Sequence, residues 1–147
     1  DGYLSTVACI DFPKPFAEGP LQVAAGGMGV HLLNMSTVGP TLDPAKPQVL
    51  LYEPKGDKLV LVGAEWFMPV QAAGSTHPAI FGQQLNGPME GHPPIMPPEL
   101  HHYDLHVWLW RDNPAGVFSP TNAAVSCPKG GYTHAAEGAK MVGGHAH

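Results

Sequence analysis

Two β-forming runs separated by a short turn constrain the fold of this chain more than any other feature of the sequence. Residues 48–53 and 58–67 flank the turn-forming residues Pro-Lys-Gly-Asp at 54–57, which is a hairpin signal. Both alternating sets of side chains in the second run are apolar, so 58–68 is predicted to be a central strand covered on both faces. Glu65 interrupts this apolar pattern, and a carboxylate in such surroundings needs a partner.

Proline and glycine exclude long regular elements over much of the remaining chain. The sequence contains 18 Gly and 17 Pro among 147 residues, about twice their usual share, and an interior proline breaks a helix. Further strands are predicted at 28–34 and 103–110, and 69–99 is predicted to be a long loop. We therefore expect a mainly β domain: a single antiparallel sheet, or a small barrel or sandwich, with long Pro/Gly-rich loops and little helix.

The run 101–110 predicts a strand with one unusual face. With a period of two, one face is apolar apart from a tyrosine. The other face carries His102, Asp104, His106, Trp108 and Trp110. Soluble proteins rarely expose two tryptophans on one strand, so this face is expected to line a core, a pocket or a partner. We predict that Asp104, Trp108 and Trp110 line a pocket.

Histidine is frequent, with nine residues among 147. Imidazole is the commonest zinc and copper ligand, and a carboxylate can complete such a set. The candidate metal ligands are His31, Glu65, His92, His102 and His106. We expect His31, Glu65 and His106 to converge in the interior, with His92 and His102 nearer the mouth of the same cavity. The alternative is a buried network of histidines bonded to carbonyls or to Glu65, with no metal.

Cys9 and Cys127 are the only cysteines, and they lie near the two ends of the patterned region. A bond between them would close a long loop and restrict the unfolded chain by roughly 4–5 kcal/mol in the entropic description. The loop-rich composition suits an exported domain, in which such bonds persist, whereas two buried free thiols are the alternative. Residues 1–127 are predicted to form one compact domain, and 128–147 a Gly/Ala-rich tail that carries histidines.

Composition and missing motifs argue against several function classes. Seven Lys and Arg against twelve Asp and Glu provide no basic patch for nucleic acid, and no run of 18 apolar residues predicts a membrane span. The chain has no nucleophile elbow, no His-Glu-x-x-His motif, no phosphate loop and no dinucleotide fingerprint. No catalytic residue is assigned, and the sequence favours a protein that is not an enzyme.

Several runs resemble a group of exported bacterial proteins to which no activity is assigned. The resemblance covers roughly residues 2–127 and is most specific over 103–127. Its motifs are Gly-Val-His at 29–31, Leu-Leu-Tyr-Glu-Pro at 50–54, Leu-Val-Gly-Ala-Glu-Trp at 61–66, Tyr-Asp-Leu-His-Val-Trp-Leu-Trp at 103–110, Asn-Pro-Ala-Gly-Val-Phe at 113–118 and Val-Ser-Cys at 125–127. It implies a secreted or periplasmic location, a Cys9–Cys127 pair and a preceding helical segment. It implies no reaction, and it does not extend to the tail.

Two functions from different classes are consistent with these patterns. The first is an exported metal-binding protein that holds copper or zinc with imidazole and carboxylate ligands. The second is a non-catalytic structural or self-assembling module of the cell exterior, with a buried His/Glu network and no metal. The first residue, Asp1, fits a mature secreted protein or a fragment of a longer chain.

Overall fold

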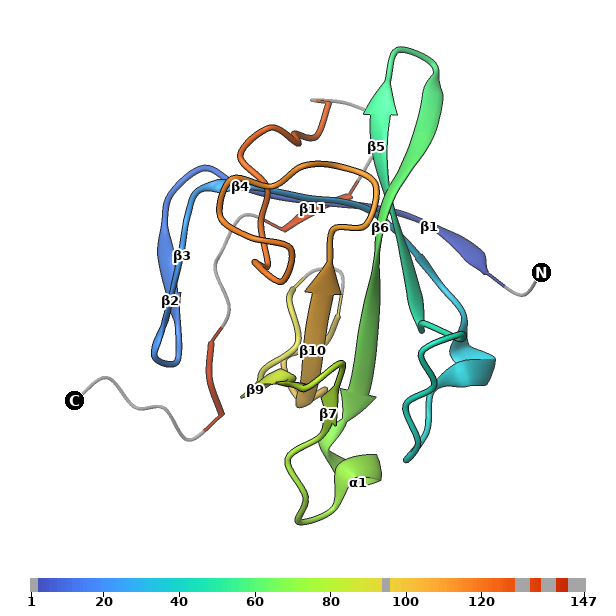
Figure 1. Cartoon of the computed structure of the whole chain (residues 1–147), viewed down its shortest axis with the longest axis vertical. Helices are drawn as coiled ribbons and strands as arrows, with labels where there is room; N and C mark the ends of the chain where they lie inside the picture. Colours follow the sequence, from blue (N-terminus) through green and yellow to red (C-terminus); the bar gives the residue numbers. More distant parts are fainter. Residues whose placement is uncertain (1–2, 94–95, 129–132, 136–139, 143–147) are drawn as a thin grey trace.

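The computed structural model describes residues 3–93, 96–128, 133–135 and 140–142 and shows a mainly β protein with little helix, as predicted. One seven-stranded sheet contains most of the regular structure (Figure 1). Its strands are, in sheet order, β11 (Thr133–Ala135), β1 (Leu4–Phe12), β4 (Gly26–Leu33), β5 (Val49–Lys55), β6 (Lys58–Pro69), β10 (His102–Val107) and β9 (Asn86–Met89). The β1–β11 pair is parallel, and the other neighbours are antiparallel.

The remaining elements are short. They are the β2–β3 hairpin (Phe16–Glu18 and Leu21–Val23), a 3-10 turn (Met35–Thr37), helix α1 (Val70–Ala73) and the β7–β8 hairpin (Ala79–Ile80 and Gln83–Gln84). The stretch 69–99 therefore contains α1, β7, β8 and β9 where a loop was expected. These elements have only two to four residues, which is too short to show a repeating apolar pattern.

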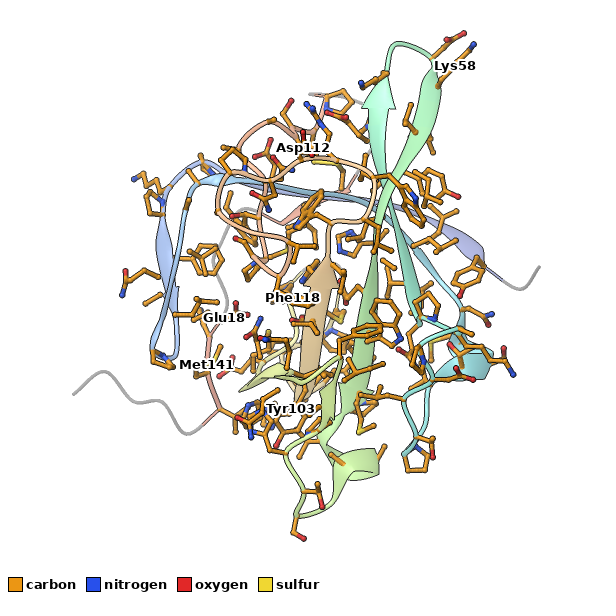
Figure 2. The ribbon with its side chains drawn as sticks, viewed as in Figure 1. Glu18, Lys58, Tyr103, Asp112, Phe118 and Met141 are labelled. Atoms are coloured by element: carbon orange, nitrogen blue, oxygen red, sulfur yellow. A yellow bond between two sulfur atoms is a disulfide. The ribbon has the colours of Figure 1, made fainter. Side chains whose placement is uncertain are left out.

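The predicted hairpin is confirmed and forms the centre of the sheet, which curls into a half-barrel. β6 lies between β5 and β10 and is buried on both faces from 62 to 68. Its first residues differ from the prediction, because Leu59 and Val60 are exposed. They follow Lys58, which lies at the projecting end of the hairpin (Figure 2). The turn is also shorter than expected, since Lys55 pairs with Lys58 and only Gly56 and Asp57 connect the strands.

β10 ends earlier than predicted, and this changes the positions of both tryptophans. After Val107 the backbone leaves the pairing with β6, so strict alternation of faces no longer applies. Trp108 packs in an apolar cluster with Val62 and donates its indole N–H to the Ser119 carbonyl. Trp110 is 60% exposed. Neither tryptophan lines the cavity described below, which corrects the expectation from the sequence.

The other face of β10 packs in the largest apolar cluster. That cluster consists of Ala64, Trp66, Ile80, Leu85, Tyr103, Leu105 and Val107, with Phe118 packed against it. Tyr103 and Phe118 lie along β10 in Figure 2. The cluster covers one side of β6 and β10, so their opposite side is left to carry the polar residues.

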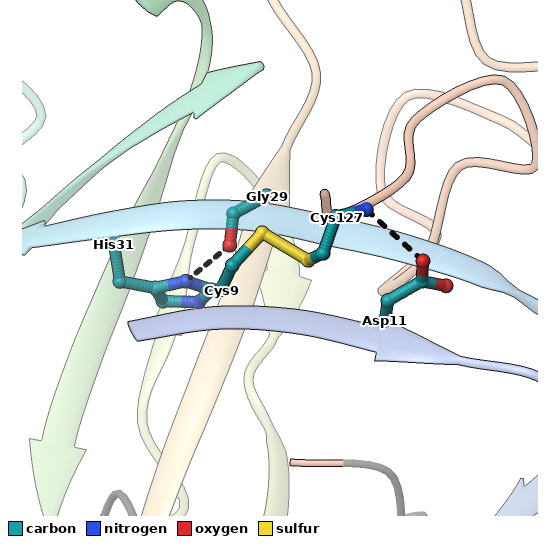
Figure 3. Close-up of a disulfide and its surroundings, with 5 residues drawn as sticks. All are labelled: Cys9, Asp11, Gly29, His31 and Cys127. Atoms are coloured by element: carbon teal, nitrogen blue, oxygen red, sulfur yellow. Dashed lines mark hydrogen bonds between the residues drawn. A yellow bond between two sulfur atoms is a disulfide. The ribbon is translucent and has the colours of Figure 1, made fainter. Parts of the chain in front are cut away.

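The structure contains the predicted Cys9–Cys127 disulfide (Figure 3). The bond ties β1 to the segment that follows the loops after β10, and the Cys127 backbone N–H donates to Asp11 Oδ2 at 3.0 Å. In β1, Cys9 is paired with Val30 of β4, next to His31. The disulfide therefore anchors the strand next to the one that carries His31.

Parts of the expected tail belong to the sheet. β11 pairs with β1, and Met141 forms an isolated bridge with Met89. The division at 127 stays a prediction, and most of the residues beyond 128 lie outside those that the structure describes. Among the described residues, no helix has the length and apolar character needed to cross a membrane.

Candidate metal centre

Strand register brings His31, Glu65 and His106 to one face of the sheet. Glu65 of β6 is paired directly with His106 of β10. Across β5, the residue paired with His31 is in turn paired with Gly63, two residues before Glu65, so His31 and Glu65 share a face. Glu65 Oε1 lies 2.8 Å from His106 Nε2 and 3.3 Å from His31 Nε2. The convergence predicted from the sequence is therefore present.

The outer nitrogen of His31 is fixed by the backbone. Its Nδ1 lies 2.9 Å from the Gly29 carbonyl oxygen (Figure 3). A carbonyl oxygen only accepts, so Nδ1 carries the proton and donates it, and Nε2 is the atom directed at Glu65. Metal-binding histidines characteristically use their second nitrogen in this way, because the bond holds both the tautomer and the orientation of the ring.

A second cluster lies beside the first and consists of His92, His102 and Asp104. His102 Nε2 is 3.4 Å from Asp104 Oδ2, and the rings of His92 and His102 are arranged edge to face with their centroids 5.6 Å apart. His102 also donates from Nδ1 to the Leu100 carbonyl at 3.0 Å. Its ring is stacked on Phe67, with centroids 4.9 Å apart. The imidazole of His102 is thus held by a hydrogen bond at Nδ1 and by stacking of one ring face on Phe67.

The two clusters are adjacent, because Asp104 faces both. Its Oδ1 lies 3.9 Å from His106 Nδ1, whereas its Oδ2 faces His102. Asp104 and His106 are two residues apart on β10, so their side chains point to the same face.

A cavity of about 200 Å³ borders both clusters. Its polar lining consists of His31, Glu65, His92, Asp104 and His106, and most of its remaining wall is apolar. His102 is absent from this lining and is 0% exposed, so the expectation that it lies near the mouth is wrong. The reason is that Phe67 and His92 cover its ring. A larger surface hollow of about 470 Å³ near α1 has no ionisable side chain in its lining and offers no comparable chemistry.

Three methionines also line the cavity: Met28, Met35 and Met96. They come from β4, the 3-10 turn and the loop before β10. These residues lie too far apart in the chain to form a methionine motif, and the fold brings them to one cavity. Thioether sulfur is a soft ligand that suits copper(I), although methionine also fills apolar gaps.

Charge pairing dominates the electrostatics of the first cluster. Burial alone would raise the pKa of Glu65, but His106 and His31 outweigh it and hold that pKa below its usual value. Burial would lower the pKa of His106, but the nearby carboxylates of Glu65, Asp104 and Glu18 raise it to about 9. Without a metal, a carboxylate and an imidazolium therefore face each other at neutral pH.

The pKa values of the two histidines of the second cluster are shifted in opposite directions. Burial would lower the pKa of His102, but Asp104 and the Leu100 carbonyl outweigh it, so the pKa is raised. For His92 burial prevails over Asp104, and the pKa is lowered. His92 is thus predominantly neutral at physiological pH, which is the form that binds a metal.

Several buried polar atoms in these clusters lack an aligned hydrogen-bond partner among the described residues: His102 Nε2, Asp104 Oδ1 and both ring nitrogens of His106. The 2.8 Å contact between His106 Nε2 and Glu65 is close, but its geometry is not that of a regular hydrogen bond, so we treat it as an ion pair. An unsatisfied buried polar atom costs about 1–3 kcal/mol. Buried polar atoms of this kind are usually satisfied by a water molecule or an ion, so a group of them beside a cavity is a candidate ligand site.

Glu18 is a further member of this region that the sequence did not reveal. It ends β2, is only 4% exposed, and lies on the side of the β2–β3 hairpin toward β10 (Figure 2). Burial first, and then the Asp104 charge, raise its pKa to about 8. In the sequence it precedes Gly19 and Pro20 and reads as part of a turn, so no local pattern marks it as buried.

Comparisons of this chain with models of known protein families, with curated proteins and with solved structures find no match.

Proposed function

We propose that this is an exported protein that binds zinc or copper through His31, Glu65 and His106. One observation carries the proposal: the chain places two imidazole nitrogens and one carboxylate oxygen within 4.8 Å of one another, from three different strands, at the wall of a cavity. Ligands bound to one ion are typically that close to one another.

The donor set fits zinc with a vacant position. Two imidazoles and one carboxylate match the three protein ligands of zinc sites that keep a fourth position for water or substrate. All three residues line the cavity, and its volume of about 200 Å³ admits water or a small molecule. Copper is the second candidate, because imidazole also suits copper and three methionines line the same cavity.

Metal uptake would displace a proton. His106 has a pKa of about 9 in the metal-free state, so the ion competes with the proton that His106 carries at neutral pH. Affinity should therefore rise with pH.

Export is supported by the disulfide. A bond between Cys9 and Cys127 persists in oxidising compartments such as the periplasm or the cell exterior. The resemblance of the sequence motifs to exported bacterial proteins points to the same location.

Metal analysis of untagged protein tests this function. Chelator-treated protein is dialysed against zinc or copper(II), and the bound metal is measured together with the far-UV circular dichroism spectrum. We expect stoichiometric binding that Glu65→Gln and His106→Ala abolish at this cluster, while His101→Ala, an exposed histidine on the same segment, leaves it unchanged. No binding by folded wild-type protein would refute the proposal and favour the metal-free structural module.

A further inference from the structure

We infer that His92, His102 and Asp104 form a second metal site, so that the protein holds two neighbouring ions. The inference rests on the proposed function, because the first ion is the one held by His31, Glu65 and His106. One nitrogen or oxygen from each residue of the second cluster lies within 4.8 Å of the others, and all three residues are buried.

His102 presents the strongest sign of a missing cation. The Leu100 carbonyl requires a proton on Nδ1, so a neutral His102 directs the lone pair of Nε2 at Asp104 Oδ2, 3.4 Å away. A lone pair facing a carboxylate repels it unless a proton or a metal ion lies between them. Nε2 has no aligned hydrogen-bond partner, so the position between these two atoms can take a metal ion in place of a proton.

The surroundings of His102 hold it as a ligand is held. The Leu100 carbonyl fixes its tautomer, and stacking on Phe67 restricts rotation of the ring. His92 approaches from the loop before β10, edge to face with His102, and supplies the second nitrogen.

One ion cannot use both clusters. Zinc in proteins takes about four ligands, whereas the two clusters together offer six side chains. The clusters meet where Asp104 of one lies beside His106 of the other. Asp104 directs Oδ2 at His102 of the second cluster, whereas its Oδ1 faces Nδ1 of His106, the ring nitrogen opposite the one directed at Glu65. One oxygen can therefore bind the second ion while the other orients a ligand of the first. His92 and Asp104 from the second cluster border the same cavity as His31, Glu65 and His106, so both ions would face one small chamber.

Stoichiometry separates this inference from the proposed function. Titration of chelator-treated wild-type protein with copper(II) should reach two equivalents. His102→Ala should reduce this to one, held by the first cluster, and Glu65→Gln should also reduce it to one, held by the second cluster. Asp104→Asn, which is nearly isosteric, replaces His102→Ala if that variant fails to fold by circular dichroism. His101→Ala is the matched control and should keep two equivalents.

Proximity is the second readout. Electron paramagnetic resonance of the doubly loaded wild type should show spin–spin broadening that disappears in His102→Ala. One equivalent in wild-type protein, unchanged by His102→Ala, would overturn the second site and leave the first. Two equivalents without broadening would also overturn it, because the second ion would then lie elsewhere, and no binding at all would refute both sites.

Discussion

The two faces of β10 are equally buried and are used in opposite ways. All six residues of the strand are buried. On one face, Tyr103, Leu105 and Val107 pack against apolar side chains of β6 and of the loops. Close packing removes apolar surface from water, at about 25 cal/mol for each Å². This face therefore contributes stability and needs no partner beyond the fold.

The other face retains polar atoms that the fold does not satisfy. His102, Asp104 and His106 lie on it, and each has at least one buried nitrogen or oxygen without an aligned hydrogen bond. Pairing with Glu65 offsets part of the cost of burying them. On this strand, burial serves packing on one side, and on the other side it gathers the polar groups on which the proposed metal sites rest.

Within β10, the largest effect on stability is expected from the apolar face. Leu105→Ala should lower the free energy of unfolding by about 2–5 kcal/mol, because it leaves a cavity in a closely packed cluster. Metal bound per folded molecule should not change, since the side chain points away from both clusters. Urea unfolding and metal analysis of the same samples measure the two quantities. Loss of metal with unchanged stability would show that the faces are not independent.

Glu65→Gln should produce a smaller loss of stability in metal-free protein, about 1–3 kcal/mol, because the buried His106 loses its charged partner. The pH dependence provides a sharper test. The pKa of His106 is raised from 6.5 to about 9, so its contribution is complete below 6.5 and is lost as the pH rises through 9. Thermal unfolding at several pH values should show this fall in wild type and a shallower one in Glu65→Gln. Identical slopes would contradict the ion pair.

Glu18→Gln should raise the stability of the metal-free protein, whereas Glu65→Gln lowers it. The pKa of Glu18 rises from 4.5 to about 8 on folding, so folding becomes less favourable as the pH rises from 4.5 toward 8. Replacing the acid with an amide removes this penalty, and we expect the metal-free variant to be more stable than wild type by about 1–2 kcal/mol at pH 8. The difference should vanish near pH 4.5, and an equal gain at both pH values would indicate better packing in place of a proton effect.

The sequence predicted what depends on local pattern and strand parity. The β5–β6 hairpin, the burial of Glu65 and its meeting with His31 and His106 all follow from alternation along paired strands. The disulfide followed from the presence of only two cysteines.

Features that depend on where the chain leaves the sheet could not be predicted. Parity placed Trp108 and Trp110 with the histidines, but β10 ends at Val107 and both side chains turn elsewhere. The burial of Glu18 and the covering of His102 by Phe67 and His92 arise from contacts between distant segments, for which one sequence gives no signal.

The smallest effect is expected from Trp110→Ala, because Trp110 lies beyond Val107, where β10 and its two buried faces end. A side chain that is 60% exposed contributes little to the core, so the free energy of unfolding should change by about 0.5 kcal/mol or less. Metal content should also stay unchanged, because Trp110 does not line the cavity.

Trp108 provides the contrast to Trp110. It is buried, and its indole N–H donates to the Ser119 carbonyl, so Trp108→Ala should lower the free energy of unfolding by about 3–5 kcal/mol. Size-exclusion chromatography of Trp110→Ala adds a second readout, since a change in oligomeric state at unchanged stability would identify Trp110 as part of a self-assembly surface.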